Sequence, residues 1–264
     1  MKGRVLVVAG SDSCGGAGIQ ADIKTITALG GYAATAVTAV TAQNTGGVFA
    51  VQDLPAEFVA QQMTLVLDDI GADVMKTGML QRAELIQCVV EVGKRYSPEM
   101  KILVDPVMYA KGGAPLLEKS ALRTLVSELV SIADLITPNL PEAGKILGSE
   151  VRSVDDMRIA VTDLLALGPK AVLLKGGHLA GKQITDFLAT ENGVEIFQSA
   201  RVMTRHTHGT GCTLASAISV GIAQGLSIRS AVVRARAYVL GAIRTAPGYG
   251  GGHGPINHTY KLPT

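Results

Sequence analysis

Residues 5–31, VLVVAGSDSCGGAGIQADIKTITALGG, contain the unit from which the rest of the fold can be predicted. Five apolar residues, Val5 to Ala9, predict a buried strand that ends at Gly10. Apolar residues then recur at helical spacing before Gly30-Gly31, namely Ile19, Ile23, Ile26 and Leu29. A strand that leads through a glycine-rich loop into an amphipathic helix is typical of a parallel sheet covered by helices.

The same alternation of strand and helix continues along the chain. Further strands are predicted at 32–41, 48–53, 74–76, 102–104, 135–136 and 171–174, with a hairpin over 184–197. Helices are predicted at 55–67, 84–95, 116–130, 157–167, 211–224 and 228–246. No linker, fixed-period repeat or low-complexity segment interrupts them. We expect one α/β domain over residues 1–264, with three layers and a mostly parallel sheet between helices.

Composition narrows the class of partner. The 264 residues are 47% hydrophobic and 17% charged, which is enough for a large core and excludes a mainly disordered chain. A net charge of +2, 4% aromatics and no tryptophan argue against a nucleic-acid partner. Mean hydropathy is +0.31, but each apolar stretch is far shorter than the roughly 18 residues a membrane span needs. Three widely spaced cysteines and no export signal predict free thiols and a cytoplasmic protein.

Ligands collect at the carboxyl ends of strands in open α/β sheets, and five unusual stretches lie at such ends. The first, Gly10 to Gly18, lets backbone approach a ligand and opens a helix, whose N-terminus attracts anions. It matches neither the P-loop nor the GxGxxG spacing, so a turn without a ligand is the alternative.

The next three stretches place polar side chains after strands. Asp105 follows the strand at 102–104 and is either a Mg²⁺ ligand or a turn residue. Asn139 either caps the helix near Pro141 or, with Glu142, lies near a metal–phosphate group. Lys175 leaves a buried strand for a glycine loop, where a phosphate would compensate its charge. The nearby His178 is interpreted as a loop residue.

The fifth stretch, Thr207 to Thr213, is the strongest local signal. Gly209-Thr210-Gly211 before a helix directs backbone N–H groups at one point, as in a phosphate or oxyanion site. Cys212 lies in the first helical turn, where the positive helix end is expected to lower the thiol pKa. Such a thiol suits a base that deprotonates an attacking hydroxyl; a small buried filler is the alternative.

In this order the stretches resemble the ribokinase-like superfamily, and more closely the hydroxymethylpyrimidine/phosphomethylpyrimidine kinases of thiamine biosynthesis. The resemblance covers 10–22, 39–45, 76–80, 104–108, 137–143, 173–178 and 208–213, with a similar tail at 252–258. The superfamily's Gly-Thr-Gly-x turn usually ends in Asp, the catalytic base, whereas the pyrimidine kinases carry Cys, as Cys212 does here. Two departures are Cys14, where Ser is expected, and Thr77, where Ile is expected.

The resemblance implies roles for the individual residues. Gln43 would hydrogen-bond an aminopyrimidine, in a pocket completed by Gly10, Ala17, Asp22, Met79 and Val107. ATP phosphates and Mg²⁺ would be held by Lys175, Asp105, Asn139, Glu142 and Thr210, while Gly209, Gly211, Lys175 and Cys212 would act in catalysis.

The activity implied is ATP-dependent phosphorylation of 4-amino-5-hydroxymethyl-2-methylpyrimidine and then of its monophosphate, in a homodimer. Pyridoxal kinase is the alternative enzyme. A sugar kinase is disfavoured because the sequence shows no cluster of carboxylates and amides that could bind the many hydroxyl groups of a sugar. The alternative that is not an enzyme is a domain that only binds pyrimidine or vitamin B6 and regulates a partner. The presence of Lys175, Asp105, Glu142 and Cys212 argues against it, because a binding domain does not need this set.

Overall fold

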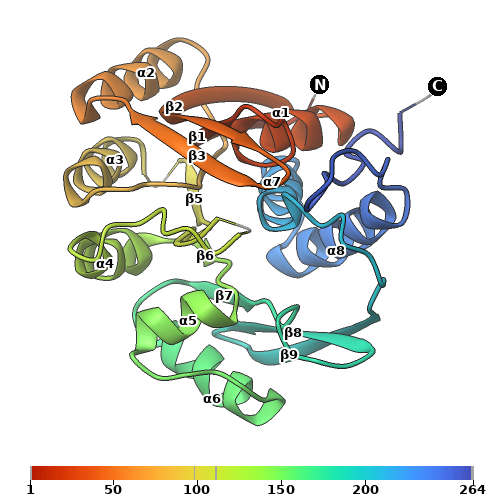
Figure 1. Ribbon diagram of the computed structural model, residues 1–264. Coiled ribbons are helices and arrows are strands. Elements are labelled where there is room, and N and C mark those ends of the chain that lie inside the picture. The colour runs from red at the N-terminus through yellow and green to blue at the C-terminus, as the bar shows by residue number, and fades with distance from the viewer. Residues whose placement is uncertain (1, 98, 111, 263–264) are drawn as a thin grey trace.

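A nine-stranded sheet runs through the part of the chain that this computed structural model describes, residues 2–97, 99–110 and 112–262 (Figure 1). The strand order is β3-β2-β1-β4-β5-β6-β7-β8-β9. Their bounds are β1 Arg4–Asp12, β2 Tyr32–Asn44, β3 Gly47–Asp53, β4 Val74–Thr77, β5 Lys101–Val104, β6 Leu135–Ile136, β7 Ala171–Leu174, β8 Gln183–Thr190 and β9 Gly193–Ala200.

The middle of the sheet is parallel and its edges are antiparallel. Strands β2, β1, β4, β5, β6 and β7 pair in parallel. At one edge β3 pairs antiparallel with β2, and at the other β8 and β9 form the hairpin predicted across Glu191-Asn192-Gly193. The prediction of a mostly parallel sheet is therefore confirmed.

Helices cover both faces of this sheet, as predicted (Figure 1). Leu6 and Val8 of β1 pack in a core shared with α2, α3, α4, α5 and α6, whereas Val5 and Val7 pack in a second core with α1, α7 and α8. Because side chains of a strand alternate between faces, burial of both faces requires the continuous apolar runs seen in the sequence. The helix bounds are α1 Gly18–Ala28, α2 Ala56–Asp69, α3 Ala83–Tyr96, α4 Ala121–Thr124, α5 Leu140–Leu147, α6 Val154–Leu165, α7 Thr210–Ala223 and α8 Ile228–Arg244.

Two predicted helices begin elsewhere. The helix predicted at 116–130 starts only at Ala121, because the backbone N–H groups of Leu116 and Glu118 donate outside the helix, to Met108 and Gln81. After α4 it continues as a π turn and a 3₁₀ turn to Ile132. The helix predicted at 157–167 starts at Val154, where Ser153 and Asp156 form a capping box that the sequence shows.

Among the described residues, no helix is both long enough and apolar enough to span a membrane.

Candidate functional site

The carboxyl ends of the parallel strands open into one cavity of about 1060 Å³. Its wall contains nearly every residue that the sequence singled out, from both ends of the chain. These are Gly10, Ala17, Gln43, Met79, Asp105, Val107, Asn139, Glu142, Lys175, Gly209, Thr210, Gly211 and Cys212. The cavity lies beside the point where β1 separates β2 from β4, which is where open α/β sheets bind ligands.

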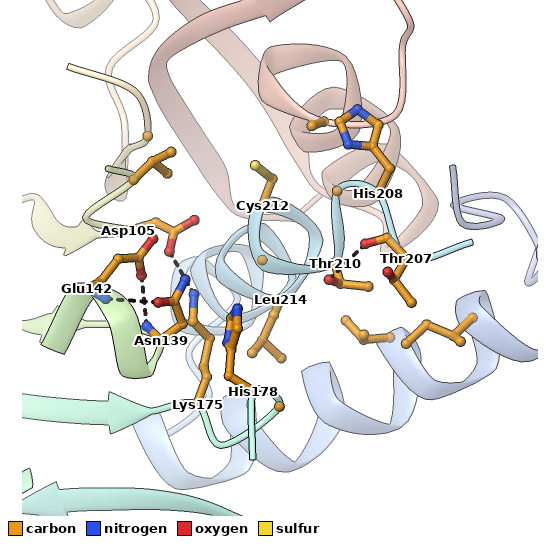
Figure 2. A pocket seen from close by; sticks show the side chains of 18 of the residues that line it. Asp105, Asn139, Glu142, Lys175, His178, Thr207, His208, Thr210, Cys212 and Leu214 are labelled. Atoms are coloured by element: carbon orange, nitrogen blue, oxygen red, sulfur yellow. Dashed lines mark hydrogen bonds and ion pairs between the residues drawn. The ribbon is translucent and has the colours of Figure 1, made fainter. Parts of the chain in front are cut away.

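An ion pair occupies one end of the cavity. Lys175, which directly follows β7, places its Nζ 3.0 Å from Oδ1 of Asp105, which directly follows β5 (Figure 2). Thr137, after β6, donates its hydroxyl to the same carboxylate oxygen at 3.0 Å. Burial opposes the charge of Lys175, but Asp105 and Glu142 more than offset it and raise the pKa of the ammonium. The lysine for which the sequence suggested only a phosphate partner is thus held by a carboxylate.

Glu142 combines both roles that the sequence left open. Its Oε2 accepts from the backbone N–H of Asn139 at 2.7 Å, and Asn139 Oδ1 accepts from the N–H of Glu142 at 3.0 Å, a capping box that starts α5. The carboxyl group is also buried in the cavity wall. Burial and nearby Asp105 raise its pKa to about 7, although Lys175 acts in the opposite direction.

The donor set at this end fits a hard divalent cation. Asp105 and Glu142 offer carboxylate oxygens from the ends of neighbouring elements, and both side chains are almost fully buried. The raised pKa of Glu142 indicates that Lys175 does not fully compensate two buried carboxylates. A bound Mg²⁺, which prefers oxygen ligands and keeps several waters, would supply the missing positive charge.

The N-terminus of α7 faces this ion pair. Gly209, at the N-cap, has a φ of +82°, and a Cβ there would lie 1.7 Å from the carbonyl oxygen of Gly16. Only glycine therefore lets the two loops meet. A Cβ on Gly211 would lie 3.6 Å from Nζ of Lys175 and 3.9 Å from Oδ2 of Asp105. The first-turn amides of α7 and the lysine thus share one side of the cavity, as anion binding requires.

Cys212 lies between the two ends of the cavity (Figure 2). The expectation that the helix N-terminus lowers its pKa is wrong: burial raises the thiol pKa to about 12. Lys76 and the Gly18 N–H act to lower the pKa, but Asp22 and Asp105 add to the increase. The sequence argument considered only the helix end, whereas burial and the carboxylates of Asp22 and Asp105, which come from distant segments, also act on the pKa of this thiol. At neutral pH the group is a thiol.

The other end of the cavity has an apolar wall and one side-chain amide. Gly10 lies against Met79, because a Cβ on Gly10 would come within 2.6 Å of the Met79 methyl group. Val107 and Ala17 add apolar wall. Gln43, on β2, exchanges hydrogen bonds between its backbone and the Ser13 hydroxyl at 2.9 Å, which ties the glycine-rich loop to the sheet. A flat heteroaromatic ring suits such a wall with one side-chain amide.

Asp22 occupies a different place from the one expected. It is fully buried on α1, outside the cavity lining, where both carboxylate oxygens lie 3.0 Å from Nζ of Lys76 and Oδ1 accepts from the Ser216 hydroxyl at 2.6 Å. Lys76, on β4, does line the cavity, and sequence reasoning missed it. Burial lowers the pKa of Lys76, but Asp22 and Asp105 outweigh it and raise the pKa, so the side chain stays charged. The available signal was a lysine inside a strand with buried neighbours on both sides.

Asp12 and His208 form a second pair that the sequence did not identify. Asp12 accepts from the backbone N–H groups of Cys14, Gly16 and Ala17 at 2.7–3.0 Å, and its Oδ2 lies 2.8 Å from Nε2 of His208. Burial tends to raise the pKa of Asp12, but the bonds from His208, Gln43 and Ala17 hold it well below its usual range. The pair joins the loop after β1 to the segment before α7.

Solved structures of small-molecule kinases share this fold. The chain superposes on pyridoxal kinase of Bacillus subtilis in its ADP complex with a TM-score of 0.91 at 33% identity, covering 98% of each chain. On phosphomethylpyrimidine kinase of Clostridium difficile the TM-score is 0.81 at 43% identity, covering 92% of this chain and all of that one. Fold and cavity thus place the chain among the ribokinase-like vitamin kinases, as the sequence predicted.

Sequence comparison defines the family. The phosphomethylpyrimidine kinase family model matches residues 12–257, and the chain belongs to this family. It is 46% identical to the hydroxymethylpyrimidine/phosphomethylpyrimidine kinase of Streptomyces coelicolor over 98% of this chain and 95% of that protein. It is 48% identical to a thiamine biosynthesis bifunctional protein of Geobacter sulfurreducens, of which it spans 52%. The chain thus corresponds to the full length of one relative and to about half of the other.

Proposed function

We propose that the protein transfers the γ-phosphate of ATP to the hydroxymethyl group of 4-amino-5-hydroxymethyl-2-methylpyrimidine, and then phosphorylates the monophosphate to the diphosphate, in thiamine biosynthesis. One observation carries the proposal. A single cavity joins an apolar-walled, amide-bearing pocket to an end where Lys175, Asp105, Glu142 and the α7 N-terminus converge. The family membership and the relatives named for this activity support it.

The residues divide the work by position. Lys175 and the amides of Gly209 to Gly211 hold phosphate oxygens at the helix N-terminus, where positioning and charge neutralisation supply most of the catalysis. Asp105 and Glu142 would hold Mg²⁺, which would supply positive charge to neutralise the transferred phosphoryl group. Gln43 binds the ring amine or nitrogen of the acceptor, between the walls made by Met79 and Val107.

Cys212 stands where the acceptor hydroxyl must lose its proton. Its thiol is protonated in the free protein, so only the small thiolate fraction can accept that proton. Lys76, which acts to lower the Cys212 pKa, favours the thiolate.

Pyridoxal phosphorylation is the second candidate. The observation that favours it is the superposition on pyridoxal kinases of Bacillus subtilis and Staphylococcus aureus, each with a TM-score of 0.91. Identity to these is 32–33%, against 42–48% to proteins named as hydroxymethylpyrimidine or thiamine biosynthesis enzymes, and this difference favours the pyrimidine.

Mass spectrometry of the products tests the proposal. The enzyme is incubated with ATP and Mg²⁺ and with the hydroxymethylpyrimidine, its monophosphate, pyridoxal or ribose in parallel. We expect mono- and diphosphate from the pyrimidines. Lys175→Ala should abolish most turnover, whereas Lys170→Ala, which removes an exposed lysine at the opposite end of β7, should not. Phosphorylation of pyridoxal alone would move the function to the alternative, and no product from any acceptor would overturn both.

We also infer that the protein is a cytoplasmic homodimer. The β2–β3 hairpin at the sheet edge exposes apolar side chains, among them Phe49, which is 74% accessible, and Val40 and Val51. Burial in a second copy would remove this patch from water. None of the three cysteines is in a disulfide, which fits a reducing compartment. Light scattering after size exclusion should give a dimer for the wild type and a monomer for Phe49→Asp; a monomeric wild type would contradict the inference.

A further inference from the structure

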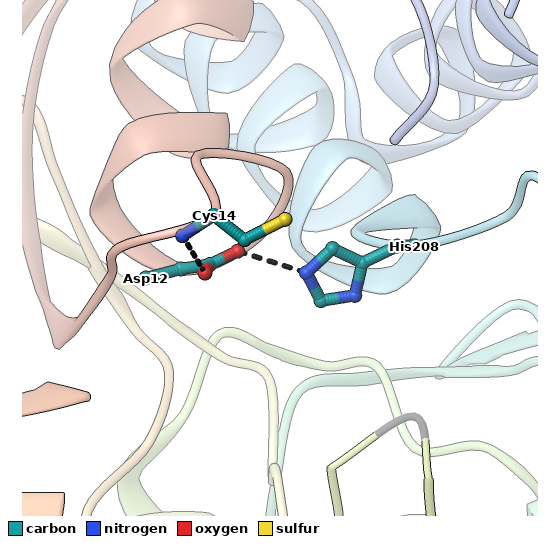
Figure 3. A group of neighbouring side chains, drawn as sticks. All are labelled: Asp12, Cys14 and His208. Carbon is teal, nitrogen blue, oxygen red and sulfur yellow. Dashed lines mark hydrogen bonds and ion pairs between the residues drawn. The ribbon is translucent and has the colours of Figure 1, made fainter. Parts of the chain in front are cut away.

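Three different donor side chains meet beside the cavity, from segments nearly 200 residues apart. Asp12 and Cys14 come from the end of β1 and the loop after it, and His208 comes from the segment before α7 (Figure 3). One carboxylate oxygen, the Cys14 sulfur and one imidazole nitrogen all lie within 4.8 Å of one another. The proposed phosphate transfer assigns no chemical step to any of the three.

The set has the chemistry of a thiophilic divalent cation. Zn²⁺ binds thiolate at about 2.3 Å and imidazole or carboxylate at about 2.0–2.2 Å, and tetrahedral angles then place neighbouring donor atoms about 3.3–3.7 Å apart. His208 Nε2 and Asp12 Oδ2 are 2.8 Å apart, so they must separate slightly, while the sulfur moves inward by about 1 Å. Thiolate and imidazole select Zn²⁺ over Mg²⁺, whereas Asp105 and Glu142 are hard oxygen ligands. The two clusters therefore favour different metals.

The cluster is also placed to affect the acceptor pocket. Asp12 lines the cavity together with Gln43, the residue that we propose binds the pyrimidine, and the Gln43 side chain acts to lower the pKa of Asp12. His208 directly precedes Gly209, whose Cα packs against the carbonyl oxygen of Gly16. An ion held by Asp12, Cys14 and His208 would cross-link the glycine-rich loop to the α7 N-terminus and draw the Asp12 carboxylate away from Gln43.

We propose that Asp12, Cys14 and His208 form a Zn²⁺ site with water as the fourth ligand, and that its occupation inhibits the enzyme. When the site fills, the Cys14 thiol releases its proton to solvent, and the proton that His208 Nε2 donates to Asp12 leaves that nitrogen for Nδ1 or for solvent, so that Nε2 binds the metal in place of the hydrogen bond. The inhibition rests on the proposed function, but the binding does not.

Cobalt(II) is the probe that tests the site, because a thiolate ligand gives Co²⁺ a charge-transfer absorption in the near ultraviolet. The wild type, Cys88→Ser and Cys212→Ser should each bind one Co²⁺ with this band, and Zn²⁺ should displace it. Cys14→Ser should lack the band and bind Zn²⁺ at least about 100-fold more weakly in competition with a chromophoric chelator. A band that persists in Cys14→Ser, one that disappears in Cys212→Ser, or no Co²⁺ binding by the wild type would each overturn the site.

Kinase assays under buffered free Zn²⁺, with Mg²⁺ and ATP in excess, test the inhibition. Turnover by the wild type and Cys88→Ser should fall as the site fills, and Cys14→Ser should need at least about 10-fold more zinc for the same loss. Equal zinc sensitivity of Cys14→Ser and the wild type would refute the inhibition. If the protein phosphorylates no pyrimidine, the proposed function fails, and the cobalt band still reports separately on the site.

Discussion

Replacing Lys76 with Met should cost the fold far more than a surface lysine would. The Lys76 and Asp22 side chains are both 0% accessible, and two N–O distances of 3.0 Å join them. Met fills nearly the same volume but leaves the Asp22 carboxylate with only the Ser216 hydroxyl. Loss of one partner from a buried pair typically costs about 3–5 kcal/mol, which is a large share of the roughly 5–15 kcal/mol that stabilises a folded protein.

The size of the loss should depend on pH. Burial already raises the pKa of Asp22 more than Lys76 and Ser216 lower it, and removing the ammonium raises it further. A carboxyl group that binds its proton more tightly in the folded than in the unfolded state destabilises the fold increasingly as pH rises above its unfolded pKa, about 3.9. Lys76→Met should therefore be closer to the wild type at pH 5 than at pH 8.

Urea unfolding followed by circular dichroism at both pH values measures these differences. A double-mutant cycle with Asp22→Leu isolates the pair, because the double variant buries no charge and should be more stable than Lys76→Met alone. Lys24→Met, which removes the exposed amine that bonds Gly15, is the matched control and should change stability by less than about 1 kcal/mol. Two results would refute the reasoning: a loss below about 1 kcal/mol for Lys76→Met at pH 8, or a double variant whose loss equals the sum of the single losses.

Three further changes test the site and the C-terminal segment. Cys212→Ala should keep pyrimidine affinity in calorimetry but lower kcat by about 100-fold or more. Wild-type kcat/KM should rise about tenfold per pH unit between about pH 7 and 9, since the thiol pKa in the free protein is about 12, and a flat profile would exclude the thiolate as base. Gln43→Leu should raise KM for the pyrimidine by about 5- to 150-fold, the equivalent of about 1–3 kcal/mol, and leave KM for ATP unchanged in steady-state kinetics; equal effects would contradict the pocket. His258, buried against Thr213 with its pKa lowered to about 4, must stay neutral in the fold, so stability should fall as pH drops from about 6.5 towards 4, and thermal unfolding of His258→Gln should show a flatter dependence.

The sequence predicts the strands best where local pattern and burial agree. The strands at Leu135–Ile136 and Ala171–Leu174 match their predicted bounds, because short continuous apolar runs fit strands that are buried on both faces. The helix predicted from Leu116 starts late because backbone contacts to Met108 and Gln81 hold its first residues elsewhere. Such contacts depend on the tertiary fold, which periodicity does not encode.

The site residues also differ in how well local sequence predicts them. Lys175, Glu142 and the Gly209 turn could be located because each follows a strand or starts a helix. The pairing of Asp22 with Lys76 could not, because it joins residues 54 positions apart, one on α1 and the other on β4. The prediction for the Cys212 pKa was wrong for the same reason, because the thiol is buried and the charged groups that act on it, Lys76, Asp22 and Asp105, come from three distant segments. Local motifs identify the residue types of a site, and the packing of the helices on the sheet sets their charges.

The protonated state of Cys212 also affects how readily this cysteine is oxidised. Peroxides and alkylating agents react with the thiolate, and a thiol whose pKa is about 12 forms almost no thiolate at neutral pH. Burial, together with Asp22 and Asp105, hinders ionisation of this sulfur and thus protects it from conversion to sulfenic acid.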